Sequence, residues 1–398
     1  MEDLYNSFYR QLRGINQKFV RYLYPLIDWN SRLIAITGAR GTGKSTLILQ
    51  HIRKTFGLAP SSVMYLSLDH IYFSEHRLYD FGTEFVKQGG KYLFLDEVHK
   101  YLNWSQEIKN LYDNYPELHI VFTGSSMLEI YKGNADLSRR VIHYFLAGMS
   151  FREYLIFENI FETKSVSLEY LLKNHLAISQ QINAVLKPLP HFQNYLRQGY
   201  YPYYKESKNL YATKLLNTLN VVLETDLPAI EKIELYSILK IKRLLIILSQ
   251  LVPFTPNITE LSAQLDVSRN SLLNYLSYLE KSQITNLLFQ NTKGMSGLSK
   301  PQKIYLNNTN LSYALGGSSI DIGSFRETFF FNQLRVVADV TYSPQTDFTI
   351  NKSHHFEIGG KNKGSEQLTG LPNAYLALDN IESGFGNKIP LWMFGFLY

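Results

Sequence analysis

Residues 38–45 read Gly38-Ala39-Arg40-Gly41-Thr42-Gly43-Lys44-Ser45 and lie between apolar runs at 33–36 and 47–49. They fit the pattern G-x-x-x-x-G-K-[ST], whose glycines let the backbone curl so that successive N–H groups face the phosphates of a nucleotide. The lysine adds a mobile positive charge, and the serine hydroxyl is a ligand for Mg²⁺. A helix that starts at the loop aims the positive end of its dipole at the same anion. The position between a strand and a helix therefore favours a phosphate-binding loop over an ordinary glycine-rich turn.

A second motif completes a candidate site for ATP and Mg²⁺. An apolar run at 92–95 ends in Asp96 and Glu97, although an exposed Asp-Glu pair at a strand end is an alternative interpretation. Mg²⁺ sheds water reluctantly, so Asp96 would hold it through its water shell. Glu97 would polarise the attacking water as a general base. The residues expected to bind the nucleotide or Mg²⁺ are Gly38, Ala39, Arg40, Gly41, Thr42, Gly43, Lys44, Ser45, Thr46 and Asp96.

Further polar residues are candidates for catalysis beside Lys44 and Glu97. The segment Phe122-Thr-Gly-Ser-Ser126 follows another apolar run, and the hydroxyl of Thr123 or Ser125 would orient the attacking water or sense the γ-phosphate, although the segment is also ordinary in turns. Arg139 and Arg140 precede the fifth strand-like run. Because an arginine supplied in trans stabilises transition-state charge, either is a candidate finger for a neighbouring subunit of a homo-oligomer. A surface pair in a basic protein is the alternative.

The order of apolar runs predicts an α/β fold for residues 1–150. Runs typical of buried strands at 33–37, 63–68, 92–95, 120–123 and 142–146 alternate with helical stretches. Such alternation is typical of a parallel sheet with helices on both faces. The first thirty residues predict an amphipathic helix, because they carry apolar side chains at helical spacing: Leu4, Phe8, Leu12, Ile15, Phe19 and Leu23.

Composition restricts the class of protein. With 398 residues, 45% hydrophobic and 19% charged, the chain should form two or three packed domains and not a disordered polymer. The absence of cysteine excludes disulfides, thiolate metal sites and a cysteine nucleophile. A formal net charge of +6 permits a polyanionic partner without requiring one. The sequence has no signal-peptide pattern, and charges interrupt its most apolar stretch, so we expect a cytoplasmic protein without a membrane segment.

The ordered motifs resemble those of the AAA+ ATPases. The likeness rests on the loop at 38–45, Leu93-Phe-Leu-Asp-Glu-Val-His-Lys100, Phe122–Ser126 and the Ser-Arg-Arg stretch that ends at Arg140. More narrowly, the chain is similar to a bacterial and archaeal group with a winged-helix segment and a C-terminal domain of uncharacterised function, through segments 195–202 and 357–363. The resemblance implies Mg²⁺-dependent ATP binding and hydrolysis and a nucleotide-driven switch.

The resemblance also implies a division of the chain into four segments. Residues 1–150 would hold the N-terminal helix and the ATPase core, and residues 151–250 a helical lid or linker. A winged helix would follow at 251–312, and an α+β domain like the restriction endonucleases at 313–398.

Residues 258–281 have the spacing of a helix-turn-helix. A short helix at 258–266 leads to a turn at which Ser268 is a candidate N-cap, and the second helix places leucines on one face. In this arrangement the second helix enters the major groove of double-stranded DNA, although winged helices also serve as packing modules. The segment Gln290–Lys303 has lysines and no acids, as a phosphate-contacting wing would. The candidate DNA contacts are Arg269, Asn270, Asn274, Lys293, Lys300 and Lys303.

Three carboxylates and a lysine near the C-terminus resemble a nuclease site of the PD-(D/E)xK type, in which carboxylates hold Mg²⁺ beside the scissile phosphate. These candidates are Glu327, Asp347, Glu357 and Lys361. The nuclease pattern has its lysine two positions after the glutamate, where this chain has Gly359, so we expect a lost or rearranged site. Three functions therefore stay open: an ATPase switch with a possible association with DNA, an ATP-licensed DNA nuclease, and a nucleotide-gated scaffold for a protein partner.

Overall fold

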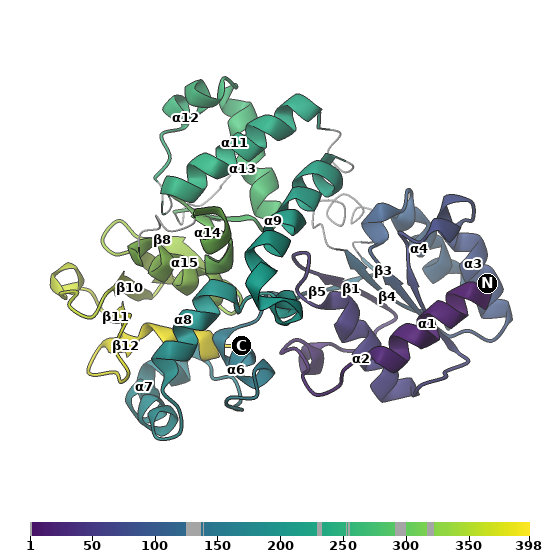
Figure 1. The fold of residues 1–398 in the computed structure, drawn as a ribbon, viewed down its shortest axis with the longest axis horizontal. Helices are drawn as coiled ribbons and strands as arrows, with labels where there is room; N and C mark the ends of the chain where they lie inside the picture. Colours follow the sequence, from purple (N-terminus) through teal and green to yellow (C-terminus); the bar gives the residue numbers. More distant parts are fainter. Residues whose placement is uncertain are drawn as a thin grey trace. The chain divides into compact units, whose positions relative to one another are not determined.

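The computed structural model describes residues 2–124, 137, 139–228, 233–251, 253, 255–290, 300–316 and 322–398 (Figure 1). The chain divides into two compact units, Met1–Gly148 and Met149–Tyr398, which we call unit 1 and unit 2. The finer division of unit 2 into a lid, a winged helix and a C-terminal domain stays a prediction. None of the helices in the described ranges combines the length and the apolar character that a membrane crossing requires.

Unit 1 is built around a five-stranded parallel sheet with the strand order β2-β3-β4-β1-β5. Because all strands run the same way, the segments that follow β1, β3 and β4 meet at one edge of the sheet, where α/β proteins place their ligands. Every residue of β1 is buried, as expected for a strand covered on both faces. The strands are β1 (Leu33–Thr37), β2 (Val63–Ser67), β3 (Tyr92–Asp96), β4 (His119–Gly124) and β5 (Ile142–Phe145).

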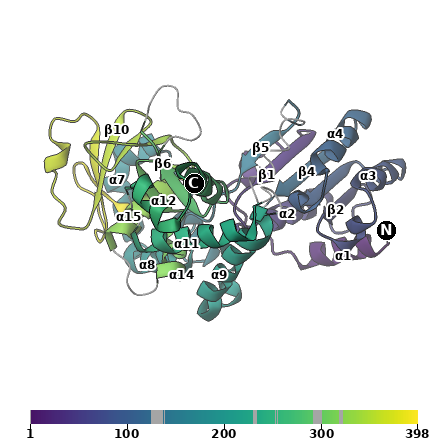
Figure 2. The same cartoon turned by 90° about the horizontal axis from the view of Figure 1, so that it is seen from above.

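Helices cover both faces of this sheet (Figure 2). The helix α1 packs against α2 and β2, whereas α3 packs against α4 on the other face. Right-handed crossovers require this arrangement, because the β1-to-β2 connection crosses the sheet in the opposite direction to the connections that follow it. The helices are α1 (Glu2–Gly14), α2 (Lys44–Phe56), α3 (Leu78–Lys87) and α4 (Trp104–Asn114), with short 3-10 helices η1 (Tyr24–Leu26), η2 (Ile71–Ser74) and η3 (Val98–Lys100).

The predicted α/β fold is confirmed, and each strand lies within one residue of its predicted bounds at either end. The predicted length of the N-terminal helix is wrong, because α1 ends at Gly14 and Phe19 and Leu23 lie beyond it. Just after the helix, the side chain of Asn16 accepts a hydrogen bond from the backbone N–H of Lys18 at 2.8 Å. Such a local side-chain bond offers the backbone a turn in place of further helix.

Unit 2 begins with a helical region and continues with a helix-turn-helix and a two-stranded antiparallel sheet of β6 and β7. The helices are α6 (Phe151–Phe157), α7 (Leu168–Asn183), α8 (Pro188–Gln198), α9 (Tyr211–Val221), α11 (Leu235–Leu251), α12 (Ile258–Leu265), α13 (Arg269–Lys281), α14 (Thr309–Gly316) and α15 (Ile322–Leu334). Short helices lie at η4 (Pro202–Glu206), η5 (Lys208–Leu210), η6 (Val222–Asp226), η7 (Glu366–Leu368) and η8 (Leu391–Phe396).

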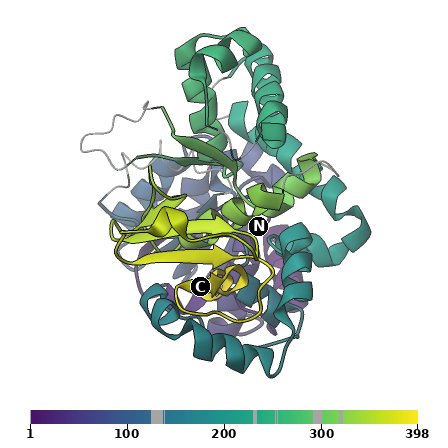
Figure 3. The same cartoon turned by 90° about the vertical axis from the view of Figure 1, so that its left-hand side faces the viewer.

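The C-terminal part of unit 2 is an α+β region with a mixed sheet of strand order β12-β11-β10-β9-β8, drawn in yellow-green in Figure 3. The strands β10, β11 and β12 are parallel to one another, and β8 and β9 pair in antiparallel fashion. The helix α15 packs against β10, with the ring of Phe330 5.1 Å from that of Phe356. The strands of unit 2 are β6 (Thr285–Leu288), β7 (Lys303–Leu306), β8 (Val340–Tyr342), β9 (Phe348–Ile350), β10 (His354–Gly359), β11 (Ala374–Leu378) and β12 (Lys388–Pro390).

Buried polar bonds join segments of unit 2 that are far apart in the sequence. The backbone carbonyl of Tyr398 accepts bonds from the hydroxyl of Ser150 at 2.7 Å and from Nε of Arg152 at 2.9 Å. The side chain of Asn310 donates to the carbonyl of Leu196 at 2.9 Å and accepts from the hydroxyl of Tyr211 at 2.6 Å. Because a buried polar group without a partner is costly, these bonds fix which segments lie together.

Candidate nucleotide site

The loop that follows β1 has a backbone that only glycine adopts readily. Gly38, Gly41 and Gly43 have φ angles of 153°, 84° and 95°. A Cβ atom at Gly38 would lie 2.3 Å from the carbonyl oxygen of Leu146, well inside van der Waals contact. The left-handed region disfavours side chains, so this curl depends on the glycines that the motif supplies. Its shape is that of an anion-binding concavity at the start of α2.

Lys44 is the first residue of α2, and its side chain is buried over the loop. Its ammonium donates to the carbonyl oxygens of Gly38 at 3.0 Å and Ala39 at 2.9 Å. A phosphate is a stronger, charged acceptor than a carbonyl. The Lys44 ammonium therefore lies at the loop, bonded to two carbonyl oxygens that a phosphate could replace.

Asp96, one of the two candidate Mg²⁺ ligands, is bonded to Tyr65 of β2. The hydroxyl of Tyr65 donates to Oδ2 of Asp96 at 2.6 Å, and the strands that carry them are paired, with Ser67 opposite Asp96. Burial and then the charge of Asp96 raise the pKa of Tyr65 far above its usual value. The Tyr65 hydroxyl and the Asp96 carboxylate therefore form one hydrogen-bonded set.

Thr123 connects this set to Glu97. Its hydroxyl donates to Oδ1 of Asp96 and accepts from the backbone N–H of Glu97 at 3.2 Å. Glu97 has a left-handed φ of 53°, which is unusual for a residue with a side chain and is maintained only where the surroundings impose it. Its carboxylate lies 3.5 Å from Nε2 of His99 and 3.9 Å from the guanidinium of Arg40.

These residues fit a nucleotide with Mg²⁺. The loop offers backbone N–H groups and the Lys44 ammonium, Ser45 follows in the first turn of α2, and Asp96 ends β3. One carboxylate and one hydroxyl suit Mg²⁺, because Mg²⁺ commonly takes one or two carboxylates plus substrate phosphates.

The remaining catalytic candidates are less closely tied to the loop. Arg140 forms a bidentate ion pair with Asp113 of α4, with N–O distances of 2.9 and 3.1 Å. Arg139 is exposed, and the role of either arginine in a neighbouring subunit stays a prediction. Ser125 lies outside the described residues.

The helix-turn-helix has the local geometry that its sequence predicts. The hydroxyl of Ser268 accepts from the backbone N–H of Ser271 at 3.1 Å and so caps α13, as predicted. The leucines of α13 are buried, whereas Arg269, Asn270 and Asn274 are exposed. Lys300 is exposed as well, and Lys293 lies outside the described residues.

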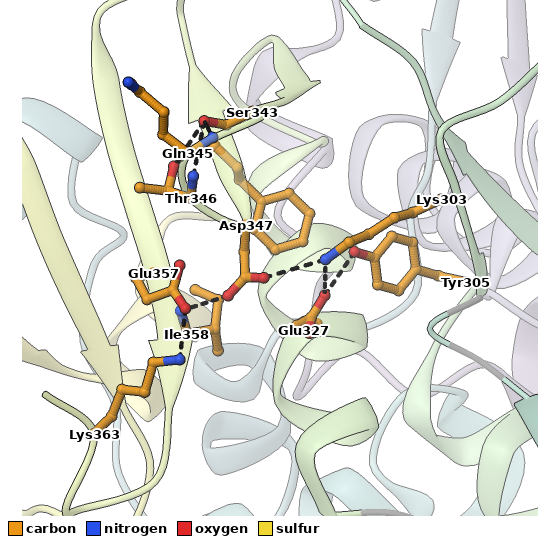
Figure 4. Close-up of polar contacts among 11 residues, drawn as sticks. Lys303, Tyr305, Glu327, Ser343, Gln345, Thr346, Asp347, Glu357, Ile358 and Lys363 are labelled. Atoms are coloured by element: carbon orange, nitrogen blue, oxygen red, sulfur yellow. Dashed lines mark hydrogen bonds and ion pairs between the residues drawn. The ribbon is translucent and has the colours of Figure 1, made fainter. Parts of the chain in front are cut away.

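The predicted role of Lys303 as a wing contact is wrong. Its ammonium lies between Glu327 and Asp347, 3.0 Å from Oε2 of the first and 3.2 Å from Oδ1 of the second (Figure 4). Burial lowers the pKa of Lys303, but the charges of Glu327 and Asp347 outweigh burial and raise it overall. The lysine is therefore a cation held inside unit 2 and does not point to a nucleic acid.

The three C-terminal carboxylates lie close to one another, but Lys361 is not their lysine partner. Lys361 is exposed after the end of β10, and Lys363 pairs instead with Glu357 at 2.7 Å. Oδ2 of Asp347 accepts from the backbone N–H of Ile358 at 2.9 Å (Figure 4). The turn at Gly359 and Gly360 changes the course of the chain after β10. Lys363, two residues after Lys361, therefore contacts the Glu357 carboxylate. Lys303 and Lys363 thus oppose the charges of this cluster from two sides.

Two parts of the chain match family models. Residues 30–155 match one described as an AAA domain, and residues 189–321 match one described as a domain of unknown function (DUF8612). Residues 30–155 of unit 1 are therefore similar to an AAA domain. The matched range includes the loop, Asp96, Glu97 and Thr123, and it indicates a nucleotide-binding ATPase domain.

The chain is also similar to "Uncharacterized protein MJ1637" of Methanocaldococcus jannaschii, at 27% identity over 286 residues, which cover 68% of this chain and 60% of that protein. The match thus spans about 60% of the length of that curated relative. Among solved structures, the chain is similar to PCH-2 of C. elegans at 17% sequence identity and a TM-score of 0.24. The match covers 44% of this chain and 46% of the PCH-2 chain. A likeness at that score supports no argument about this chain.

Sequence reasoning missed two residues of the nucleotide site. Tyr65 lies in the apolar strand β2, which pairs with the strand that ends in Asp96. A tyrosine in such a strand is the sequence feature that could have identified it. Arg21 is buried, and its guanidinium donates to the carbonyls of Thr42 and, at 2.7 Å, Ala147. It fell within the predicted N-terminal helix, where nothing in the sequence distinguishes it from a surface arginine.

Proposed function

We propose that unit 1 binds ATP with Mg²⁺ and hydrolyses it. The observation that carries this proposal is the chain of contacts from Tyr65 through Asp96 and Thr123 to Glu97, beside a loop whose carbonyl oxygens bind the Lys44 ammonium. These residues come from four segments of the chain, and each is of the type that the chemistry needs at its position. The match to the AAA domain model supports the same function.

Each side chain has a role in this proposal. The ammonium of Lys44 would exchange its two carbonyl partners for the β- and γ-phosphate oxygens. The hydroxyl of Ser45 and, through water, Asp96 would hold Mg²⁺, which when bound neutralises charge on the phosphates. Glu97 would accept the proton of the attacking water, and Thr123 would fix the backbone N–H of Glu97.

Two variants test the assignment. For Lys44→Ala we expect ATP affinity in the presence of Mg²⁺ to fall by about tenfold or more, measured by titration calorimetry. For Glu97→Gln we expect ATP to bind with nearly unchanged affinity but to be hydrolysed about 10²–10⁴-fold more slowly. Lys87→Ala, which removes an exposed lysine at the end of α3, is the matched control and should behave as wild type. Tight ATP binding by Lys44→Ala would refute the proposal.

We further propose that the nucleotide state changes how unit 1 and unit 2 work together, as a molecular switch. The division of the chain into two compact units supports this idea, because hydrolysis in unit 1 can then change the conformation or binding of unit 2. Scattering profiles of Glu97→Gln with ATP and of wild type with ADP should differ. Identical profiles would refute the proposed switch but not the proposed ATPase activity.

Double-stranded DNA is a candidate partner of unit 2, supported by the exposed Arg269, Asn270 and Asn274 on a capped α13. We expect Arg269→Ala to weaken DNA binding by about tenfold or more, with binding that falls steeply as salt rises. Lys281→Ala, at the other end of α13, is the control. The absence of salt-dependent DNA binding would favour the third function, a scaffold for a protein partner.

Nuclease activity is not part of this proposal. A metal ion at Glu327 and Asp347 would have to displace Lys303, whose ammonium already bonds to both, and Glu357 is bonded to Lys363. We expect plasmid DNA to stay intact with this protein, Mg²⁺ or Mn²⁺, and ATP. Cleavage that is lost in Asp347→Asn would contradict this expectation.

A further inference from the structure

Arg21 is a buried arginine of unit 1 that contacts the loop at residues 38–45. It lies in the segment between α1 and β1 and is 4% exposed. Its guanidinium donates to the carbonyl oxygen of Thr42, inside the loop, and to that of Ala147, just after β5, at 2.7 Å. A guanidinium keeps its positive charge in proteins, and a buried charge is costly. An uncharged side chain would therefore suit this position better unless the guanidinium had a role.

The backbone on either side of Arg21 is held in place by hydrogen bonds. Before it, the carbonyl of Phe19 accepts from the side-chain amide of Gln50, on α2, at 2.8 Å. After it, the hydroxyl of Tyr22 donates to the carbonyl of Phe145, in β5, at 3.1 Å. The guanidinium of Arg21 therefore reaches the loop from a fixed position.

The bond from Arg21 orients the peptide unit between Thr42 and Gly43. A peptide unit is planar and almost always trans, so its C=O and N–H groups point in opposite directions. The carbonyl of Thr42 points to Arg21, and the N–H of Gly43 therefore points away from it. Gly43 is the N-cap of α2, and the first N–H groups of a helix have no partner inside the helix. The Gly43 N–H thus belongs to the donors that a phosphate at this loop would meet.

The same bond also makes the Gly43 N–H a stronger donor. A charged donor at the carbonyl of Thr42 polarises the peptide unit, and hydrogen bonds in series strengthen one another. Glycine adopts many backbone conformations, so a loop built on it needs contacts that select one of them. The bond from Arg21 is such a contact, next to a φ of 95° at Gly43.

We propose that Arg21 is a positioning residue for the phosphates of the nucleotide, which holds and polarises the Thr42–Gly43 peptide so that the Gly43 N–H donates to a phosphate oxygen. This inference rests on the proposed function and deepens it, because it adds to phosphate binding a residue that lies outside the G-x-x-x-x-G-K-[ST] pattern. The alternative is that Arg21 only connects the loop to the end of β5 and contributes to stability alone.

The test compares affinities for ATP with Mg²⁺ and for inorganic tripolyphosphate in EDTA, by titration calorimetry, in wild type, Arg21→Met and Arg32→Met. Arg32→Met is the matched control, because Arg32 also donates to two backbone carbonyls, those of Tyr112 at 2.8 Å and Tyr115 at 3.1 Å. Arg32 directly precedes β1, whereas the loop follows β1, so the two lie at opposite edges of the sheet.

We expect Arg21→Met to lose about tenfold or more in affinity for both ligands, because it removes a charge-assisted bond that acts on a phosphate donor. Arg32→Met should bind both ligands as wild type does, even where urea denaturation shows that it is equally destabilised. A role in stability alone would lower the stability of both variants and change neither affinity.

Arg21→Lys is a second variant, for use if Arg21→Met does not fold. It keeps the positive charge but lacks the planar guanidinium that reaches both carbonyls at once, so we expect a smaller loss for both ligands. Wild-type affinity for tripolyphosphate in Arg21→Met or in Arg21→Lys would overturn the positioning role, and so would a loss that is confined to ATP. A wild type that binds neither ligand would instead refute the proposed function.

The Gly43 N–H can also be observed directly by NMR. With ¹³C in the carbonyls of threonine and ¹⁵N in the amides of glycine, the signal that disappears in Thr42→Ser belongs to Gly43. We expect tripolyphosphate to move this proton signal downfield in wild type, as a new hydrogen bond does, and to move it less in Arg21→Lys. A Gly43 signal that stays in place while wild type binds tripolyphosphate would refute the inference and leave the proposed function intact. The labelled pairs are Thr37–Gly38, Thr42–Gly43, Thr123–Gly124 and Thr369–Gly370.

Discussion

Gly38 is the residue of the loop with the least room for a side chain. In Gly38→Ala, the new Cβ would meet the carbonyl oxygen of Leu146 at 2.3 Å, and alanine disfavours a φ of 153°. We expect a loss of about 3 kcal/mol or more in the free energy of unfolding, measured by urea denaturation. Gly14→Ala is the control, because no atom lies within 4 Å of its added Cβ. A Gly38→Ala protein as stable as wild type would mean that the loop has a different backbone.

His51 makes the stability of unit 1 depend on pH. It lies on α2, stacked on Trp29 with ring centroids 3.8 Å apart. Burial, and to a lesser degree the charge of Lys54, lowers the pKa of His51 to about 4. Between pH 6.5 and 4 the unfolded chain binds a proton that the folded chain does not, so stability is retained above pH 6.5 and lost as pH falls through that window.

The expected loss from His51 is about 3 kcal/mol over the whole window. Urea denaturation at pH 7 and at pH 4.5 would measure most of it. His51→Gln should reduce the pH dependence, whereas His76→Gln, at an exposed position, should not. An unchanged pH dependence in His51→Gln would show that other groups cause it.

At the scale of elements, Lys303 joins β7 to α15 and to the turn before β9. In Lys303→Met, Glu327 and Asp347 lose a shared cation within 3.2 Å. Breaking a buried ion pair costs about 3–5 kcal/mol, and because Lys303 is partly exposed we expect about 2 kcal/mol of lost stability in urea. Adding Glu327→Gln should recover part of the loss. Lys300→Met, at an exposed position of the same segment, should have little effect.

The strands of unit 1 were predictable from sequence, because a strand buried on both faces is a continuous apolar run, as Leu33–Thr37 is. Asp96 and Thr123 were predictable for the same reason, since each directly follows or ends such a run, and Lys44 was predictable from the G-x-x-x-x-G-K-[ST] pattern. The end of α1 was not, because a single turn at Asn16 outweighs the apolar spacing that continues to Leu23.

The charge partners in unit 2 were not predictable, because they depend on long-range packing. A run of lysines without acids is typical of a solvated wing, yet Lys303 lies against Glu327, 24 residues later. In the same way, spacing along an ideal strand selects Lys361, but the strand ends at Gly359 and Lys363 makes the contact. The hydrogen bond of Tyr65 in unit 1 was not predictable for the same reason, because its partner Asp96 is 31 residues away.

At the scale of the whole molecule, the bonds of Ser150 and Arg152 to Tyr398 span 248 and 246 residues. A ribosome adds about 5–20 residues per second, so roughly 10–50 s separate the synthesis of α6 from that of its partner. Every strand of the sheet in unit 1 is complete by Phe145, and that unit can close on the ribosome during this interval. A nascent chain that stalls late would therefore present a finished glycine-rich loop at residues 38–45, joined to a second unit in which α6 still lacks the C-terminal segment against which it packs.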